Sequence, residues 1–495
     1  MSHLGYLYKM GKGVEKNTAE ADRCFRLALQ NGLREKAERG LADAQFYLGY
    51  LYDTGSGIAA NAREAIKWYS KAAAQGHTSA QHNLGLKYLR NPEVKNEREA
   101  VKYFRMVADK DFATAQYILA KCYYEGKGVE QNYTEAFKYY SKAAAKDLAA
   151  AQYMLGECYY FGRGVEQNFY EAFKYYSLVA AENYAETQYA LGRCYYFGKG
   201  VAKDYYQAFQ YFNKAAEKQH IRAQYYLGEC YFNGRGVSKN KQTGIKWYQK
   251  SAAQKDPLAQ CALAWRYKIG DGVKKNTAES DRYFRLAHQN GLRKEAEQGD
   301  ITAQYYLGYC YNSGYGVPQD YQEGFNWTRK AAEQGLAGAQ NNLGAYYLNG
   351  TGVQQDSEEG VKWLRKAAEQ GLADAQNNLG YCYKKARGVA LNIDQAVYWY
   401  RKAADQGHAN ALNNLGSCYI NGQGVKRNYP EALNYFRKAA EKGNIPALFN
   451  MGLCYEKGYG ITRNTNEAIK YYRKAAEKGN DKAKKALQRL QRYRR

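Results

Sequence analysis

The sequence predicts an all-α protein, an α-solenoid of about thirteen helical hairpins that repeat every 36 residues. Three observations lead to this fold class. Ala-Gln pairs recur at the repeat spacing, apolar residues recur within each repeat on one helical face, and an Asn or Asp opens a second helix in every repeat. At 495 residues the chain is also too long for one compact core, and 45% hydrophobic residues with only 5 prolines are typical of a folded chain.

The first helix of each repeat is defined by its apolar positions. When the anchor alanine, such as Ala44 or Ala80, is counted as position 1, position 5 is Leu in twelve of thirteen repeats, with Met451 in the last. Position 6 is Gly or Ala throughout, and position 9 is Tyr in all thirteen, as in Tyr159 and Tyr195. Because positions 1, 5, 8 and 9 share one helical face, we expect the invariant tyrosines in the core and a close helix approach at position 6.

A short turn separates the two helices of each repeat. Most turns read Gly-x-Gly-Val or Gly-x-Gly-Ile, as in residues 126–129, and position 18 is then Asn or Asp in all thirteen repeats. Position 21 is Glu or Gln in twelve repeats, with Thr243 as the exception. This spacing is typical of a helix N-cap. The second helix should therefore begin directly after position 18.

Three repeats depart from the period. One lacks the glycine turn at residues 90–94 and is one residue short, so its connection should be distorted. Two others carry eight extra residues, 31–38 and the near copy 290–297, which predict an added helical turn that is a tolerated insertion, a hinge or a contact loop. Because the copies lie 259 residues apart, a block of seven repeats looks duplicated. We expect a first block of repeats at 1–258 and a second at 259–480.

The two ends of the chain differ. Residues 481–495 form half a repeat rich in Lys and Arg, which predicts a basic C-terminal capping helix. The sequence begins inside a first helix, without such a cap. Two explanations remain open: the chain is cut from a longer parent, or its first hairpin leans on another molecule, which includes self-association through this uncapped repeat.

These motifs resemble the Sel-one-like repeat (SLR) family, relatives of the tetratricopeptide proteins. The pattern Ala-x-x-x-Leu-Gly-x-x-Tyr-x-x-Gly-x-Gly-Val, followed by Ala-x-x-(Trp/Tyr)-(Tyr/Phe)-x-x-Ala-Ala, runs almost unbroken from Leu4 to Gly479. The resemblance implies a right-handed superhelix that serves as a scaffold or adaptor in multiprotein assemblies and binds ligands on its concave side. A fold alone does not fix a function.

The ten cysteines indicate a reducing compartment. Eight occupy position 8, next to the invariant tyrosine: Cys122, Cys158, Cys194, Cys230, Cys310, Cys382, Cys418 and Cys454. Equivalent helices of neighbouring repeats lie about 10 Å apart, beyond the roughly 7 Å that a disulfide spans between Cα atoms. We therefore expect free, buried thiols and a cytoplasmic protein. The sequence has no long apolar run, and its first six residues lack the basic-then-apolar layout expected of a secretion signal; export into a host cell is compatible with it.

No motif for catalysis, metal binding or cofactor binding stands out. No Cys-x-x-Cys pair or Cys/His cluster has zinc spacing, and the six histidines fall at unrelated repeat positions. The glycine turns follow helix ends instead of strands, so we interpret them as C-caps and not as phosphate loops. We expect a protein that is not an enzyme and needs no cofactor. A hydrolase is a remote alternative, since that activity has been credited to a few proteins of the family that the sequence resembles.

The net charge leaves several kinds of partner open. The chain carries 73 Lys and Arg against 48 Asp and Glu, a net charge of +25, which suits acidic proteins, anionic membrane surfaces or nucleic acid. An Arg-Lys ladder recurs in the C-terminal half, at Arg329-Lys330, Arg365-Lys366, Arg401-Lys402, Arg437-Lys438 and Arg473-Lys474. An acidic residue follows each Arg by four positions and should pair with it. We interpret the ladder as a solvated outer face and not as a phosphate track.

The candidate binding surface is formed by positions 3, 7 and 10, which lie opposite position 5 on the first helix. Over twelve repeats these positions hold four basic and four acidic residues, so the surface is neutral although the chain is basic. Four successive repeats fill it with Tyr117, Lys121, Tyr124, Tyr153, Glu157, Tyr160, Tyr189, Arg193, Tyr196, Tyr225, Glu229 and Phe232. Farther along it carries Asn341, Asn377 and Asn413, with Asn342, Asn378, Asn414 and Asn450 beside them.

These side chains favour a protein-binding function. Aromatic rings with polar tips are typical of interface hot spots, and asparagine amides can hydrogen-bond a peptide backbone. In the opposing interpretation the tyrosines only pack between adjacent helices. We hypothesise a scaffold or adaptor that binds one or more proteins or peptides on its concave face. The main alternative is a nucleic-acid-binding solenoid, which the charge of +25, the tyrosines and the basic tail suggest and the neutral inner face opposes.

Overall fold

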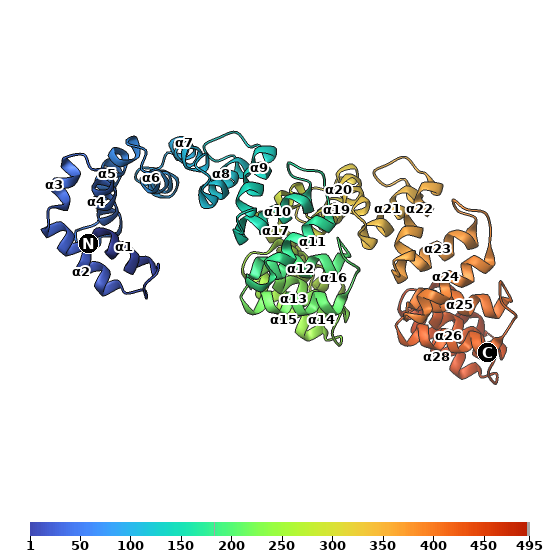
Figure 1. Cartoon of the computed structure of the whole chain (residues 1–495). Coiled ribbons are helices and arrows are strands. Elements are labelled where there is room, and N and C mark those ends of the chain that lie inside the picture. Colours follow the sequence, from blue (N-terminus) through green and yellow to red (C-terminus); the bar gives the residue numbers. More distant parts are fainter. Residues whose placement is uncertain (183, 493–495) are drawn as a thin grey trace. The chain divides into compact units, whose positions relative to one another are not determined.

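The computed structural model describes residues 1–182 and 184–492, and helices are their regular secondary structure. These residues form 29 α-helices and one 3-10 helix, η1 (Ala180–Glu182), with no β-strand among them. Figure 1 shows the helices following one another as antiparallel hairpins. The predicted fold class, an all-α solenoid of thirteen hairpins, is confirmed.

Thirteen helices form the first arm of a hairpin, and most have 13 residues. They are α1 (Ser2–Met10), α4 (Ala42–Thr54), α6 (Thr78–Arg90), α8 (Ala113–Glu125), α10 (Ala149–Phe161), α12 (Ala185–Phe197), α14 (Ile221–Asn233), α16 (Pro257–Ile269), α19 (Ile301–Ser313), α21 (Ala337–Asn349), α23 (Ala373–Lys385), α25 (Ala409–Asn421) and α27 (Ile445–Lys457). We call these the A helices.

Thirteen further helices form the second arm. They are α2 (Thr18–Gln30), α5 (Ala62–Ala74), α7 (Glu97–Ala108), α9 (Tyr133–Ala144), α11 (Phe169–Leu178), α13 (Tyr205–Glu217), α15 (Lys241–Ala253), α17 (Thr277–Gln289), α20 (Tyr321–Glu333), α22 (Ser357–Glu369), α24 (Ile393–Asp405), α26 (Tyr429–Glu441) and α28 (Thr465–Glu477). We call these the B helices. Two short helices, α3 (Leu33–Glu38) and α18 (Leu292–Glu297), and the last helix, α29 (Asp481–Arg492), complete the set.

The B helices begin where the N-cap pattern predicts. In every repeat the side-chain oxygen of the position-18 Asn or Asp accepts a hydrogen bond from the backbone N–H three residues later, as from Glu135 to Asn132 at 3.0 Å. Thr243, the exception at position 21, is capped by Asn240 in the same way, because the bond uses the backbone and not the side chain.

Many of the glycine turns that follow the A helices also contact the preceding repeat. At Gly164 φ is +74°, and a Cβ atom would lie 2.0 Å from the carbonyl oxygen of Tyr133, the first residue of α9. The same contact recurs at Gly200 with the carbonyl of Phe169. The second glycine is therefore required by close packing between repeats as well as by its backbone conformation. This supports the interpretation of the turns as structural elements.

The core lies between the two arms of each hairpin. Aromatic side chains of the B helices, such as Tyr140, Tyr176 and Phe212, are completely buried. They face the small residue at position 6 of the A helix: a Cβ atom at Gly156 would lie 2.6 Å from Cε1 of Tyr176. The predicted close approach at position 6 is confirmed. Any larger residue there would push the two arms apart.

The chain divides into two compact units, one from Met1 to Gly244 and the other from Ile245 onward. Within each unit, a B helix packs on the A helix of the next repeat, as α7 does on α8 in the first unit and α22 on α23 in the second. All ten cysteines are buried and carry free thiols.

The two eight-residue insertions form the short helices α3 and α18. Each packs on the following A helix, α4 or α19, and so occupies the place that a B helix takes elsewhere. Arg34 in α3 donates a hydrogen bond to the hydroxyl of Tyr52 at 2.7 Å, and Arg293 in α18 donates one to Tyr311 at 2.5 Å. Each insertion is thus a packed helical turn that holds the next repeat.

The repeat without a glycine turn has a different connection. The C-cap residue after α6 is Asn91, whose φ of −84° is not left-handed, whereas the C-cap before a normal turn is a left-handed glycine such as Gly126. The backbone N–H of Asn96 still donates to the carbonyl of Tyr88 at 2.8 Å, as the N–H of Asn132 does to Tyr123 in the following repeat. The short turn therefore keeps the register of the next helix.

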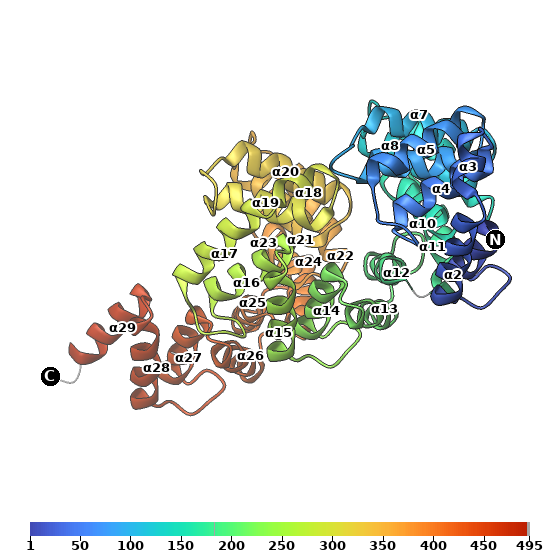
Figure 2. The same ribbon diagram turned by 90° about the vertical axis from the view of Figure 1, so that its left-hand side faces the viewer.

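Helix α29 packs on α28 at the C-terminal end of the second unit (Figure 2). Ala483 and Ala486 are buried against the last hairpin. Arg489 donates to the Glu456 carboxylate of α27 at 2.6 and 2.7 Å. Residues 493–495 of the predicted capping segment lie outside the described residues.

Candidate partner-binding surface

The candidate inner residues of the first unit differ widely in exposure. Tyr117, Tyr124, Tyr153, Glu157, Tyr189 and Glu229 are half-buried, and Lys121 is exposed and lies 3.8 Å from Glu125. Tyr160, Arg193, Tyr196, Tyr225 and Phe232 are buried, with 2–7% of their surface exposed. The prediction that these five positions face away from the core is therefore wrong.

Tyr196 shows how contacts between consecutive repeats bury an inner residue. The ring of Tyr196 lies 5.4 Å from that of Tyr226 on the next A helix and 5.9 Å from that of Phe212 on its own B helix. Tyr189 stacks on His220 of the next repeat at 4.6 Å. A helical wheel describes one helix alone, whereas in a solenoid the following hairpin covers part of the inner face. The interpretation that these tyrosines pack between helices fits Tyr160 and Tyr196.

A buried charge pair lies among these rings. Arg193 donates to Glu157 at 2.9 Å, and the hydroxyl of Tyr176 donates to the same carboxylate oxygen at 2.5 Å. The Arg193 guanidinium also lies 3.8 Å from the centre of the Tyr160 ring. Burial raises the pKa of the Tyr176 phenol, and the neighbouring Glu157 carboxylate raises it further, so the phenol stays protonated and donates. The network joins α10, α11 and α12.

The same arrangement recurs at two other places. In the first unit Tyr69 donates to Asp53 at 3.2 Å, and Lys87 of the next repeat pairs with that carboxylate. At the end of the second unit Tyr472 donates to Glu456 at 2.8 Å, and Arg489 completes the group. Three of the four acidic inner residues thus accept a hydrogen bond from a tyrosine of their own repeat and pair with a Lys or Arg side chain of the segment that follows. These inner charges stabilise the stacking of repeats.

The sequence predicts the invariant tyrosines of position 9 in the core; Tyr123 is buried there, whereas the other twelve are half-buried. Tyr159 and Tyr195 are half-buried and stack on Tyr175 and Tyr211 of their own B helices, with ring centres 5.8 and 5.7 Å apart. Elsewhere the hydroxyl at this position accepts a hydrogen bond from an arginine of the preceding B helix, as from Arg105 to Tyr123 at 2.7 Å. The invariant ring therefore bridges two repeats.

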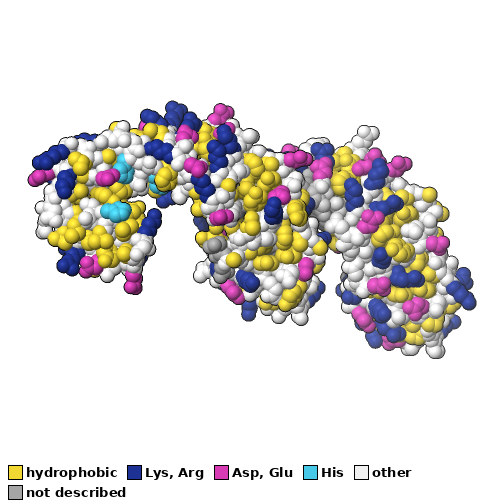
Figure 3. Space-filling model, viewed as in Figure 1, with side chains coloured by type: hydrophobic (Ala, Val, Ile, Leu, Met, Phe, Trp, Pro, Cys, Tyr) yellow, Lys and Arg dark blue, Asp and Glu magenta, His cyan; other side chains and the backbone are white. Residues whose placement is uncertain are grey.

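The arginine ladder of the C-terminal half takes part in these bridges. Arg365 donates to the hydroxyl of Tyr383 at 2.9 Å, and Arg401 donates to that of Tyr419 at 3.4 Å. Both residues are exposed, but their guanidinium groups are oriented along the protein surface by these bonds. On the face that Figure 3 shows, Lys and Arg side chains are interspersed with Asp and Glu in both units.

In the second unit the candidate asparagines form a hydrogen-bonded ladder. Asn378 donates to the Oδ1 atom of Asn341 at 3.0 Å, Asn414 donates to Asn377 at 3.0 Å, and Asn450 donates to Asn413 at 2.8 Å. Asn341 and Asn413 are half-buried, and Asn377 is 8% exposed. An amide nitrogen carries two N–H donors, so each of these ladder bonds uses only one of them. The ladder runs through α21, α23, α25 and α27.

Sequence reasoning missed one exposed aromatic residue on this face. Tyr381 is at position 7 of α23, one turn after Asn377, and 46% of its surface is exposed. The equivalent residues of the neighbouring repeats, Ala345 and Ser417, are small and leave its ring uncovered. Comparing position 7 between adjacent repeats would have identified it, because a large residue between two small ones cannot be covered by them.

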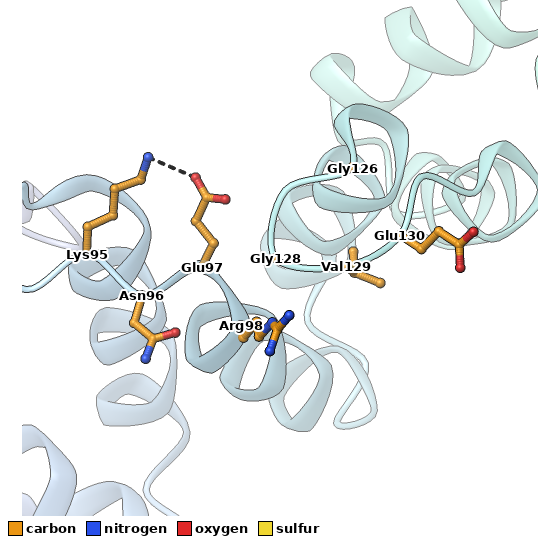
Figure 4. Close-up of a pocket in the computed structure, with 8 residues that line it drawn as sticks. All are labelled: Lys95, Asn96, Glu97, Arg98, Gly126, Gly128, Val129 and Glu130. Carbon is orange, nitrogen blue, oxygen red and sulfur yellow. Dashed lines mark ion pairs between the residues drawn. The ribbon is translucent and has the colours of Figure 1, made fainter.

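An open polar hollow lies in the first unit, between the glycine turn after α8 and the start of α7 (Figure 4). Its volume is about 670 Å³, and its charged lining residues are Lys95, Glu97, Arg98 and Glu130. Lys95 pairs with Glu97 at 2.9 Å, and the hydrogen bond from Lys95 lowers the pKa of that carboxyl group. The two signs of charge balance, so the hollow has no selective attraction for an ion.

Over residues 1–182 and 184–492, no group of three or more His, Cys, Asp or Glu side chains is arranged to hold a metal ion. Over the same residues, no helix combines the length and the apolar composition needed to cross a bilayer.

The helical hairpins, joined by hydrogen bonds between consecutive repeats, define a helical repeat protein of the α-solenoid class. The chain belongs to the Sel1 repeat family, whose repeat matches it thirteen times, at residues 1–33, 42–77, 78–112, 113–148, 149–184, 185–220, 221–256, 257–292, 301–336, 337–372, 373–408, 409–444 and 445–480. The predicted family resemblance is confirmed. The insertions α3 and α18 lie at the two interruptions between consecutive repeats.

Solved structures of bacterial repeat proteins are similar to this chain. A protective antigen of uropathogenic Escherichia coli with an SLR fold is 31% identical, with 93% of this chain and 97% of that chain covered and a TM-score of 0.46. A Sel1 repeat protein from Oxalobacter formigenes is 29% identical, with 64% and 89% covered and a TM-score of 0.40. A comparison with curated proteins gives no match.

Proposed function

We propose that the protein is a non-enzymatic scaffold that binds an extended segment of a partner protein along the asparagine ladder of its second unit. Sel1 repeats usually mediate protein interactions, which supports a scaffold. The observation that carries the proposal is the line of asparagine amides on α21, α23, α25 and α27 with the exposed Tyr381 beside it. We call this surface the asparagine face.

The chemistry of the asparagine face suits a polypeptide backbone. The second N–H group of each ladder amide can donate to a carbonyl oxygen of an extended peptide. Because each repeat supplies such an N–H donor, the contacts with the peptide backbone are periodic and do not depend on the side chains of the peptide. Tyr381 adds a large apolar area with a hydroxyl tip, which is typical of an interface anchor. In the first unit the half-buried Tyr117, Tyr124, Tyr153 and Tyr189 and the exposed Lys121 would provide a second, smaller contact.

The charges favour a protein over a nucleic acid at this face. Lys384 is the basic residue at the inner positions of the helices that carry the ladder, so a phosphate backbone would find few cations there. The nearby Arg365 and Arg401 bond tyrosine hydroxyls of the following repeats. Binding through amides and one aromatic ring should depend little on salt.

Affinity capture with two matched tyrosine variants tests the proposal. Tyr381 and Tyr398 are equally exposed, at 46%, but Tyr398 is on the B helix α24, which carries none of the ladder asparagines. Tyr381→Ala should weaken binding of the captured partner by about 1–2 kcal/mol, or roughly tenfold, while Tyr398→Ala leaves it unchanged. Melting temperatures of both variants should equal that of the unchanged chain.

Nuclease treatment and salt separate the proposal from its main rival. Binding that survives nuclease and changes less than about twofold between low and moderate salt supports a protein partner. Loss of binding on nuclease treatment, or equal binding by Tyr381→Ala and the unchanged chain, would refute the asparagine face as the partner site.

A further inference from the structure

The asparagine face presents its amide groups in a row with a fixed spacing. Asn341, Asn377 and Asn413 occupy position 3 of α21, α23 and α25, and the next residue is also an asparagine in each of these helices. Equivalent helices of neighbouring repeats lie about 10 Å apart, so equivalent amides are separated by about the same distance. A bound segment must therefore offer hydrogen-bond acceptors about 10 Å apart to engage every repeat.

Hydrogen bonds between the repeats fix the orientation of these amides. Each bond of the ladder joins an Nδ2 atom to an Oδ1 atom of the preceding repeat, and its length stays between 2.8 and 3.0 Å. The donors Asn378, Asn414 and Asn450 are half-buried, so each keeps part of its surface accessible to a partner. Because the same bond recurs, the remaining N–H group of each donor has the same orientation relative to its repeat. The row is therefore regular in direction as well as in spacing.

The backbone conformation of a partner determines where its carbonyl oxygens lie. In a β-strand the carbonyls on one side recur every second residue, about 6.7 Å apart, which does not match a spacing of about 10 Å. In an α-helix the carbonyls are already bonded within the helix. In a polyproline II helix three residues complete one turn and rise about 9.3 Å, and the backbone makes no internal hydrogen bonds. Every third carbonyl of that helix therefore points the same way, at nearly the spacing of the row.

Tyr381 provides a contact for the side chains of such a helix. Its ring is 46% exposed, and the equivalent residues of the neighbouring repeats, Ala345 and Ser417, are small. Half-buried Ile420 and Leu453 extend the apolar surface at the inner positions of α25 and α27. Proline-rich segments in the polyproline II conformation bind to surfaces lined by aromatic rings, against which the proline rings pack. The asparagine face thus combines a row of backbone donors with an aromatic contact.

The charge of the asparagine face favours an uncharged partner segment. At positions 3, 7 and 10 of α21, α23, α25 and α27 the side chains of Asp, Glu, Lys or Arg are those of Lys384 and Glu456. Glu456 is 7% exposed and accepts hydrogen bonds from Tyr472 and Arg489, so its charge is already paired. An acidic or basic peptide therefore gains little electrostatic attraction at these positions, whereas a proline-rich segment needs none.

We propose that the asparagine face binds a polyproline II segment of a partner protein, with one turn of three residues for each repeat. This rests on the proposed function, because it specifies the conformation of the segment that the scaffold binds. The ladder runs over four A helices and so over three intervals. These intervals span about 30 Å, which a polyproline II helix covers with about ten residues. Such a segment is ordered before it binds, so it loses little conformational entropy.

Fluorescence anisotropy with labelled synthetic peptides tests the proposal on the full-length chain. The probes are three uncharged peptides of equal length, about twelve residues: an all-proline peptide, an all-threonine peptide and a Gly-Ser peptide, which favour a polyproline II helix, a strand and a flexible coil. The proline peptide should bind at least about tenfold more tightly than the other two, and its affinity should fall with each turn of three residues removed. Tyr381→Ala should weaken its binding about tenfold, and Tyr398→Ala should leave it unchanged.

Two results would overturn the proposal. The first is a proline peptide that does not bind, or that binds no more tightly than the threonine or Gly-Ser peptide, because the face would then not select a polyproline II helix. The second is binding of the proline peptide that Tyr381→Ala leaves unchanged, because the peptide would then lie elsewhere on the chain. Either result leaves the proposed function in place if capture of the partner still depends on Tyr381. Capture that does not depend on Tyr381 refutes the proposed function instead.

Discussion

Arg193 donates a hydrogen bond to Glu157 at 2.9 Å, and the two residues occupy the same position in consecutive repeats, 36 residues apart. On a single helical wheel both residues face outward, and their opposite charges suggest a neutral binding surface. In the folded chain they neutralise each other inside the stack, with Tyr176 bonded to the same carboxylate. The opposite charges at the inner positions of these two repeats therefore arise from a contact between the repeats and do not indicate a binding surface.

Removal of Arg193 should destabilise the first unit strongly. Arg193→Met leaves Glu157 partly buried beside Tyr176 without its cation, and breaking such a pair costs about 3 kcal/mol. The double variant Glu157→Gln with Arg193→Met removes both charges and should recover at least half of the loss. Urea unfolding of the three proteins measures the difference. An Arg193→Met midpoint equal to that of the unchanged chain would show that the pair contributes nothing.

Neighbouring tyrosines should differ in their importance for stability. Tyr196 is 6% exposed and surrounded by rings of its own and the next repeat, so Tyr196→Ala should cost about 3 kcal/mol or more. Tyr195 is half-buried and stacks on Tyr211, so Tyr195→Ala should cost about 1–2 kcal/mol. Denaturant unfolding of both variants provides the test. If Tyr195→Ala lost more unfolding free energy than Tyr196→Ala, the invariant position would contribute more to stability than the inner position, which would contradict this prediction.

A pair of glycine substitutions separates packing between repeats from backbone strain. Gly164 and Gly76 both have left-handed φ, +74° and +81°, so an alanine costs about 1 kcal/mol in backbone conformation at either site. At Gly164 its Cβ would also meet the Tyr133 carbonyl at 2.0 Å, whereas no atom lies within 4 Å at Gly76. Gly164→Ala should therefore lower the melting temperature further than Gly76→Ala. Equal melting temperatures would mean that the turn moves away from α9 without cost.

The features of one repeat could be predicted from the sequence, because they depend on residues close together in the chain. The N-cap at Asn132 and the contact between Gly156 and Tyr176 follow from spacing within a single hairpin. The burial or exposure of the individual inner-face residues could not be predicted in the same way. Whether Tyr196 is buried depends on Tyr226 of the next repeat, and whether Tyr381 is exposed depends on Ala345 and Ser417 on either side.

Bonds between repeats have spacings of their own, which a search for the 36-residue period alone does not find. The asparagine ladder joins residues 37 apart, such as Asn341 and Asn378, and the arginine bridge joins residues 18 apart, such as Arg365 and Tyr383. A search for complementary polar pairs at these two spacings would have predicted both. It would also have shown that the ladder asparagines are partly bonded to one another.

Stability should fall steeply in alkaline solution. Burial raises the pKa of Cys122 to about 11, and that of Cys158, Cys194 and Cys230 to about 12. In the unfolded chain a thiol ionises near pH 8.5, so above that pH the unfolded state binds fewer protons than the folded state. The stabilising contribution of each buried thiol is therefore complete below about pH 8.5 and is lost as the pH rises through its folded value.

At pH 10 the loss amounts to about 2 kcal/mol for each such thiol, and the buried phenols add to it above pH 10. Melting temperatures at pH 7, 9, 10 and 11 should show a plateau followed by a steep decline. Cys158→Ala removes one ionisable group and should lose less stability between pH 8 and 10 than the unchanged chain. A melting temperature that stays constant up to pH 10.5 would mean that these thiols do not remain protonated inside the fold.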